Sequence, residues 1–355
     1  ALLFSIKYLL EKQKETYLLY ISIFLGLSVG STVLFLPYLF FIIFSLYILD
    51  KDNSLNFKKV SFLLSITFLI FYPIFRIISI LPFRLIYILS DFVYIIIYKL
   101  IKYRVKLVRN NLELAFPEYS STKRLTIESN FYRHFCDIML ESIKSMGMTK
   151  KQILKRYEFK NQSIVYDLLK KNKSIVLLMG HYSNFEWAMS VGHYLDNVKG
   201  VGIYTPITNK YFEKLMQKVR KRHKGYLLSR YKVHDYMKSE EEKNNLNIYG
   251  FATDQSPRPT EKTYWRKFLN VNVPFFTGGE RIANKYEYSI VFGLAKRVKR
   301  GYYTFNIFGT TKKTDHPYDI TNQFVEFIEK QIREHPSEYL WTHNRFKYKD
   351  LYGKF

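Results

Sequence analysis

Short apolar runs alternate with stretches of helical periodicity through most of the chain beyond residue 120. Runs rich in β-branched and aromatic residues predict strands at Ser174–Gly180, Gly200–Tyr204, Leu246–Thr253, Tyr288–Leu294 and Tyr302–Phe308. The predicted helices are Thr122–Met146, Ser163–Lys171, Asn184–Tyr194, Lys210–His223, Gly279–Tyr286 and Thr321–His335. Strands that alternate with helices indicate an α/β domain, with a mixed, largely parallel sheet flanked by helices.

The N-terminal part has a different pattern. Thr16–Leu49 contains no charged residue and is longer than the ~20 residues that a helix needs to span a bilayer. Gly26, Gly30 and Pro37 lie within it, so one long tilted span and a broken helical pair both remain open. A second apolar stretch, Val60–Phe75, is marginal for spanning. We therefore expect N-terminal membrane helices, followed by lysines that favour the cytoplasmic side.

Between these stretches and the α/β domain lies an apolar and basic region. Charges are sparse from Arg76 to Lys99, as in a helix at a membrane interface. A basic cluster without acids follows, made of Lys99, Lys102, Arg104, Lys106 and Arg109. It is either a solvated helix face or a contact for anionic headgroups, and the adjacent apolar helices favour the second. The predicted organisation is a membrane segment (1–60), membrane-proximal helices (61–118) and a catalytic domain (119–355).

Composition narrows the classes of partner. The 355 residues carry a formal net charge of +25, which suggests nucleic acid, an anionic membrane surface or an acidic protein. Basic residues next to a stretch of transmembrane length favour lipid over nucleic acid. The single cysteine, Cys136, excludes a disulfide framework or a four-cysteine zinc site within this sequence, and its apolar neighbours predict a buried packing residue.

The candidate chemistry lies in "SIVLLMGHYSNFEW", residues 174–187. His181 follows the predicted strand, at the strand end where α/β folds place ligand-facing residues. Ser183 and Glu186 form a Ser-x-x-Glu capping-box pattern, so Glu186 is expected in the first helical turn, from which it can reach back. By spacing alone, the pair is either a polar turn with its cap or a general base with a supporting carboxylate.

A resemblance gives weight to the second interpretation. "GHYSNFEW" resembles the His-x4-acid motif of the lysophospholipid acyltransferase superfamily. More narrowly, residues of about 65–350 resemble the bacterial lipid A biosynthesis acyltransferase family. The blocks that carry this likeness, in order, are "LPFRLIYILSDFVYIIIY", "YRVKLVRNNLELAFPE", "FYRHFCDIMLESIK", "YTPITNKYFEKLMQKVRKRHKG", "ATDQSP", "TYWRKFLNVNVPFFTGGERIA" and "YLWTHNRFK".

The resemblance implies a glycerolipid acyltransferase-like fold and direct acyl transfer from a thioester, the donor being acyl carrier protein. His181 would deprotonate the acceptor hydroxyl, and Glu186 would orient the His181 ring and stabilise its charge. An arginine of "VRKRHKG" would serve the substrate; Arg220 and Arg222 both fit, and the spacing to Gly225 favours Arg222. Asp254 and Asn184 complete the implied substrate-binding set. No metal or cofactor is expected.

The family likeness also implies where the enzyme works. The acceptor would be an anionic lipid, a lipid A precursor, at the cytoplasmic face of the bacterial inner membrane. A lysophospholipid, an aminolipid or a glycolipid is the alternative acceptor. Ser183 stands where relatives often carry Gly, and Phe185 and Phe346 stand where they often carry Trp, so the substrate pocket is expected to differ. A histidine base predicts activity that rises through roughly pH 6–7.

Rival classes have weaker support. A metal hydrolase using His181, Glu186 and His193 lacks a His-Glu-x-x-His pattern. A serine nucleophile lacks its Gly-x-Ser-x-Gly elbow. Gly278 and Gly279 precede a predicted helix and could offer N–H groups to an anion, or could simply form a turn into that helix.

Overall fold

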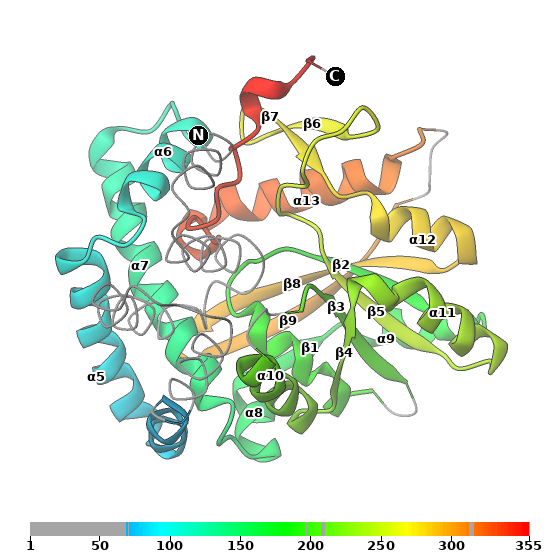
Figure 1. Ribbon diagram of the computed structural model, residues 1–355, viewed down its shortest axis with the longest axis horizontal. Helices are drawn as coiled ribbons and strands as arrows, with labels where there is room; N and C mark the ends of the chain where they lie inside the picture. Colours follow the sequence, from blue (N-terminus) through cyan, green and yellow to red (C-terminus); the bar gives the residue numbers. More distant parts are fainter. Residues whose placement is uncertain (1–68, 70, 196–197, 207–209, 312–315, 355) are drawn as a thin grey trace, which may run out of the picture.

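The fold is built around one central sheet (Figure 1). The computed structural model describes residues 69–354 except 70, 196–197, 207–209 and 312–315. The strands of the main sheet run in the order β1-β9-β8-β2-β5-β3-β4. Their bounds are β1 Tyr157–Lys160, β2 Ile175–Met179, β3 Lys199–Tyr204, β4 Gly225–Ser229, β5 Asn247–Ala252, β8 Ser289–Lys299 and β9 Tyr302–Gly309.

Most neighbouring strands are parallel. β2 pairs in parallel with both β5 and β8, and β3 pairs in parallel with β4 and β5. The exception is the hairpin of β8 and β9, which is antiparallel. The expected mixed, largely parallel sheet is therefore confirmed, with β2 at its middle.

Strand β2 is apolar throughout because both of its faces are covered. Val176 and Leu178 belong to one hydrophobic cluster, whereas Ile175 and Leu177 belong to another. Side chains alternate between the two faces of a strand, so these clusters lie on opposite sides of the sheet. The first contains residues of α7, α12 and α13, and the second contains residues of α8, α9 and η2.

Helices surround the sheet and precede it (Figure 1). Residues 71–80 are helical. The further helices are α5 Phe83–Tyr94, η1 Ile95–Leu100 (a π-helix), α6 Val105–Ala115, α7 Ser121–Lys144, α8 Lys150–Arg156, α9 Gln162–Leu169, α10 Lys210–Arg222, α11 Val233–Glu242, α12 Gly278–Tyr286 and α13 Asp319–Glu334, with 3-10 turns η2 Phe185–His193, η3 Arg230–Lys232, η4 Pro336–Glu338 and η5 Lys349–Leu351.

Helix α7 is unusual because it buries acids as well as apolar residues. Ser120 caps its start by accepting a hydrogen bond from the Lys123 N–H. Glu128, Asp137 and Glu141 are all buried along it. Each meets donors from the helices before it or from the sheet, for example Arg109 for Glu128. Since a buried charge must be paired, these acids fix how helices α5, η1 and α6 dock on the domain.

All five predicted strands are confirmed within a few residues, and so are the helices at 122–146, 163–171, 210–223, 279–286 and 321–335. The segment predicted as a helix from Asn184 to Tyr194 forms a 3-10 helix, η2. The structure adds β1, β4, α8 and α11, which are short or weakly periodic. It also adds a separate antiparallel hairpin, β6 Tyr264–Phe268 with β7 Val271–Phe275.

Membrane helices were predicted in the N-terminal part of the chain. Thr16–Leu49 lies outside the described residues, so its predicted membrane helices stay a prediction. Among residues 69–354, apart from the gaps given above, no helix combines the length and the apolar character needed to cross a bilayer. Helices α5, η1 and α6, which lie in the region predicted as membrane-proximal, share one hydrophobic cluster with the sheet. Cys136 is buried, as predicted.

Two glycines begin α12, and the second of them, Gly279, has a packing role. A Cβ added to Gly279 would lie 2.6 Å from Leu178 Cδ2 of β2, whereas one added to Gly278 meets nothing within 4 Å. Gly279 thus lets α12 approach the sheet closely, which neither interpretation of the glycine pair anticipated.

We predict that Gly279→Ala lowers the free energy of unfolding by about 1–3 kcal/mol, because the added methyl group overpacks the contact with β2. Gly278→Ala is the matched control and is expected to be neutral or slightly stabilising. Thermal unfolding of both variants measures this. Equal stability of the two variants would contradict the close-packing role.

Candidate active site

His181 lies directly beyond the end of β2, on the segment 180–184. Gly180 makes the turn possible without crowding, since a Cβ there would lie 2.9 Å from Ile328 Cδ1 of α13. The backbone N–H of His181 donates to Asp254 Oδ2 at 3.0 Å. The first residue of the motif is therefore tied to the loop after the neighbouring strand by its backbone.

Asp254 holds the imidazole as well. Its Oδ1 lies 2.7 Å from His181 Nδ1, and its side chain is 2% exposed. Asp254 follows β5, the parallel neighbour of β2, and the Thr253 N–H continues that pairing by donating to the Met179 carbonyl at 3.1 Å. Two parallel strands thus deliver His181 and Asp254 to the same edge of the sheet.

The hydrogen bonds decide which nitrogen of His181 carries the proton in the neutral ring. A carboxylate only accepts, so Nδ1 carries hydrogen and donates to Asp254. Nε2 is then an acceptor, and the Gln255 side-chain amide lies 3.2 Å from it. An imidazole in this state can take up a further proton at Nε2.

The charges around His181 favour its protonated form. Burial acts to lower the pKa of His181, but the Asp254 charge and its hydrogen bond outweigh burial and raise that pKa above the usual value. Glu186 adds to this rise and Arg220 opposes it. Burial acts to raise the pKa of Asp254, but His181 outweighs it and lowers that pKa.

Glu186 has a different partner from the expected one. Its Oε2 accepts from Arg220 Nη2 at 2.9 Å, and its Oε1 is buried without a hydrogen-bond partner among the described residues. The prediction that Glu186 reaches back to His181 is corrected by this geometry, because the carboxylate bonded to the imidazole is that of Asp254. The η2 backbone carries Glu186 to a separate pocket, where its charge meets α10.

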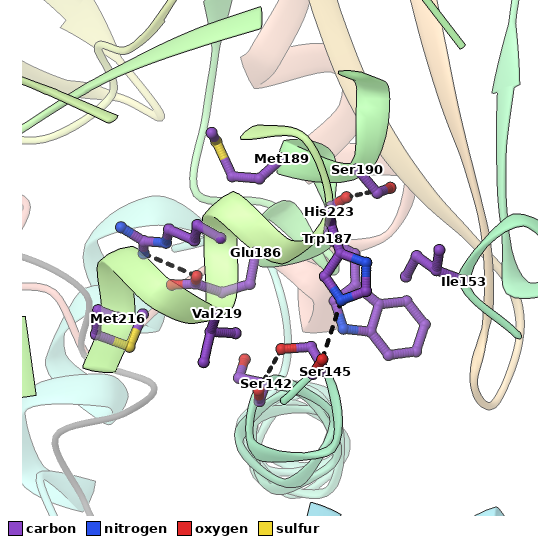
Figure 2. A pocket seen from close by; sticks show the side chains of 11 residues that line it. Ser142, Ser145, Ile153, Glu186, Trp187, Met189, Ser190, Met216, Val219 and His223 are labelled. Carbon is purple, nitrogen blue, oxygen red and sulfur yellow. Dashed lines mark hydrogen bonds and ion pairs between the residues drawn. The ribbon is translucent and has the colours of Figure 1, made fainter. Parts of the chain in front are cut away.

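Figure 2 shows that pocket, with Glu186 pointing into it from η2 and serine side chains approaching from α7. It is lined by Ser142, Ser145, Ile153, Glu186, Trp187, Met189, Ser190, Met216, Val219, Arg220 and His223. The Arg220 side chain is 15% exposed, so the Glu186–Arg220 ion pair is largely removed from water.

The preference for Arg222 is also corrected. Arg222 is exposed, and its Nε donates to the Met148 carbonyl at 3.2 Å. Side chains two positions apart on a helix do not share a face. Arg220 therefore faces the pocket, whereas Arg222 faces solvent.

Asn184 is a structural cap rather than an open substrate contact. It is fully buried, its oxygen accepts from the Trp187 N–H, and its amide donates to Glu141 Oε2 at 2.7 Å. Asn184, and not Ser183, is the N-cap of η2, so the predicted capping box is wrong. Ser183 has φ +50°, in the left-handed region that favours glycine.

The C-terminal segment, residues 338–343, is hydrogen-bonded to the backbone of the His181 segment. The Leu340 N–H donates to the His181 carbonyl at 3.2 Å, and the Ser183 N–H donates to the Glu338 carbonyl at 2.8 Å. His343 accepts from the Ser256 N–H through Nε2, and burial lowers the pKa of His343 to about 3. Neither Gln255 nor His343 was predicted as a site residue, although both lie in blocks that carry the family resemblance, "ATDQSP" and "YLWTHNRFK".

His193 does not join His181. It packs edge-on against His223, with ring centroids 5.8 Å apart. Within the part of the chain that the structure describes, no three His, Cys, Asp or Glu side chains come together as a metal site.

Most of the chain is similar to one known protein family. The family model described as bacterial lipid A biosynthesis acyltransferase matches residues 56–348. The chain belongs to the bacterial lipid A biosynthesis acyltransferase family. It is therefore an acyltransferase, and the predicted family is confirmed.

Similar curated proteins agree with this assignment. The acyltransferase is 22% identical over 251 residues to the lipid A biosynthesis palmitoleoyltransferase of Escherichia coli, a match that covers 70% of this chain and 80% of that protein. A lipid A biosynthesis acyltransferase of Shigella flexneri matches to the same extent. The lipid A biosynthesis lauroyltransferase of Escherichia coli is 22% identical over 271 residues, 75% of this chain and 87% of that protein.

We predict that Asp254→Asn lowers the pKa of His181, because it removes the negative charge and the charge-assisted hydrogen bond that favour the imidazolium. Glu186→Gln is the matched control and is expected to lower this pKa less. Histidine NMR titration of the folded variants measures both. A larger shift in Glu186→Gln would show that Glu186, and not Asp254, is the main partner.

Proposed function

We propose that the acyltransferase moves a fatty acyl chain from an acyl thioester, carried by acyl carrier protein, to a hydroxyl group of a lipid A precursor. The observation that carries this proposal is the imidazole of His181, held at Nδ1 by Asp254 with Nε2 left as an acceptor. The family and the names of the similar proteins support the acceptor.

In the proposed reaction, His181 Nε2 takes the proton of the acceptor hydroxyl as its oxygen attacks the thioester carbonyl. The tetrahedral intermediate collapses, the C–S bond breaks, and the thiolate leaves with the proton that His181 returns. The products are an ester and a free carrier thiol. No covalent acyl-enzyme is needed, and Asp254 stabilises the imidazolium that forms between the steps.

We assign the orienting role to Asp254, and we retain Glu186 as part of the site in a second role. Glu186 holds the Arg220 guanidinium by one nitrogen, and within the part of the chain that the structure describes Arg220 Nε is buried without a hydrogen-bond partner. A guanidinium has further donors for an anionic group. Arg220 is thus our candidate for contact with a substrate phosphate.

Exposed apolar side chains support membrane association. Leu85, Ile88, Phe92 and Ile95 are exposed at helical spacing along α5 and the start of η1. More than half of the exposed large apolar side chains in the described residues lie between 69 and 101. Apolar helix faces beside basic residues suit the interface of an anionic bilayer, and we place the enzyme at the cytoplasmic face of the bacterial inner membrane.

The positive charge on the exposed face of α10 supports an acidic protein, acyl carrier protein, as the acyl donor. Lys214, Lys218, Lys221 and Arg222 are exposed along this helix. Its one acid, Glu213, accepts a hydrogen bond from Gln217 within the helix. A basic surface next to the Glu186–Arg220 pocket would attract an acidic carrier protein by charge complementarity.

We predict that the purified full chain adds one acyl group to a tetra-acylated lipid A precursor when supplied with lauroyl- or myristoyl-carrier protein. His181→Ala and Asp254→Asn should each lower kcat by about 10²-fold or more, since the base or its partner is lost. Product mass and initial rates measure this.

Activity should rise with pH through a midpoint above the ordinary histidine value, because the base works deprotonated and its pKa is raised.

The outcomes separate the parts of this proposal. A rate that stays flat from about pH 5 to 8, with chemistry rate-limiting, would contradict His181 as the base. Transfer to a lysophospholipid, an aminolipid or a glycolipid, but not to the lipid A precursor, would replace the acceptor and keep the reaction.

We predict that α5 lies at the bilayer surface. Ile88→Cys and Tyr231→Cys are a matched pair, with 65% and 73% of the native residue exposed. A fluorophore sensitive to polarity, attached at each cysteine, should shift to shorter wavelength only at position 88 when the chain is reconstituted into anionic vesicles. The native Cys136 is buried and should remain unlabelled in the folded chain. Identical spectra at both positions would disprove this orientation.

A further inference from the structure

The carboxylate of Glu141 lies at the junction of α7, α5, η2 and the sheet, outside the residues assigned to the reaction. Its side chain is fully buried on α7. Tyr87 of α5 donates to Oε1 at 2.8 Å, and Tyr303 of β9 donates to Oε2 at 2.8 Å. The third donor is the Asn184 amide, 2.7 Å from Oε2.

These contacts make Glu141 more than a packing residue. Burial raises the pKa of Glu141 to about 7, although its three hydrogen-bond donors act to lower that pKa. A buried carboxylate costs free energy unless its oxygens are satisfied. Here the satisfaction comes from side chains of three separate elements, so their relative positions are fixed by one group.

The contact with Asn184 matters for the site. His181 and Asn184 are the two ends of a four-residue segment, 181–184. Asp254 fixes the first end through the backbone and the ring of His181. Glu141 fixes the second end, because it accepts from the Asn184 side chain that caps η2. The Glu141 backbone carbonyl also accepts from the Trp187 indole at 3.2 Å.

The segment between these ends needs such support. Ser183 has a left-handed backbone, which a residue with a side chain adopts at a cost in free energy. Glu186, which holds Arg220, follows two residues after Asn184. A shift of Asn184 would therefore move the base on one side and the Glu186–Arg220 pair on the other.

We propose that Glu141 is a positioning residue for acyl transfer, which sets the backbone from His181 to Glu186 through its hydrogen bond with Asn184. The inference rests on the proposed reaction, and it adds a residue from the helix that also binds α5. Through Tyr87 and Asn184, Glu141 forms a hydrogen-bonded link between α5 and the motif.

A pair of substitutions tests the hydrogen bond itself. Asn184→Asp keeps an oxygen for the Trp187 N–H and remains a good N-cap, but it sets one carboxylate against another. We expect kcat to fall by between about tenfold and 100-fold, with KM for the donor changed by less than about threefold, because the reacting groups and not the donor surface are displaced. Adding Glu141→Gln places an amide donor opposite the introduced carboxylate and should restore kcat to within about threefold of the native rate.

Glu128→Gln is the control for loss of a buried acid. Glu128 is buried on the same helix and accepts from Tyr98 and Arg109, but none of the hydrogen bonds described for it reaches η2. Its substitution should lower the thermal midpoint and leave kcat within about threefold of native. Native kcat in a folded Asn184→Asp variant, or a double variant no faster than Asn184→Asp alone, would overturn the role of Glu141.

A measurement without substrate separates this inference from the proposed reaction. The rate at which diethyl pyrocarbonate modifies His181, followed by mass spectrometry of the peptide, reports how firmly the segment is held. It should rise in Asn184→Asp, return in the double variant and stay unchanged in Glu128→Gln. If the native chain transfers no acyl group, the reaction fails, and this pattern still supports or refutes positioning by Glu141.

Discussion

The bond between His181 and Asp254 depends on the pairing of two parallel strands. β2 and β5 run side by side in register, and His181 and Asp254 each stand two residues beyond the end of their strand. The carboxyl ends of parallel strands meet at one edge of a sheet, where α/β folds bind ligands. The 2.7 Å contact follows from that edge, and it decides the tautomer of the ring and the raised pKa of His181.

The second charged pair is organised differently. Glu186 comes from η2 and Arg220 from α10, and both are largely withdrawn from water. Two carboxylates therefore influence His181, but only Asp254 is hydrogen-bonded to it, since the partner of Glu186 is Arg220. Asp254 binds the ring, whereas Glu186 acts on it through charge alone and is itself held by a guanidinium. In the reaction that we propose, one carboxylate orients the base, and the other holds a cation for an anionic substrate group.

Helix α7 connects this edge of the sheet to the preceding helices α5, η1 and α6. Its buried acids accept from Tyr87, Arg109 and Arg300, among others. A buried carboxylate requires partners in a definite geometry, so the helices that expose apolar side chains at the surface are fixed to the same element that supports η2. The exposed stripe of α5 and the His181 segment are thereby parts of one arrangement, although they are about 90 residues apart in the sequence.

The α/β class, five apolar strands, most helices and the place of His181 at a strand end could all be predicted from the sequence. Periodicity of apolar residues carries this information locally, and the order of the motif blocks carries the family. It could not choose the partner of His181. Spacing along one chain favoured Glu186, five residues away, over Asp254, which is 73 residues away. Only the parallel pairing of β2 with β5 brings Asp254 to the ring, and only the direction of α10 turns Arg220 inward and Arg222 outward. Such contacts depend on the path of the backbone between distant segments, so the tertiary structure decided them.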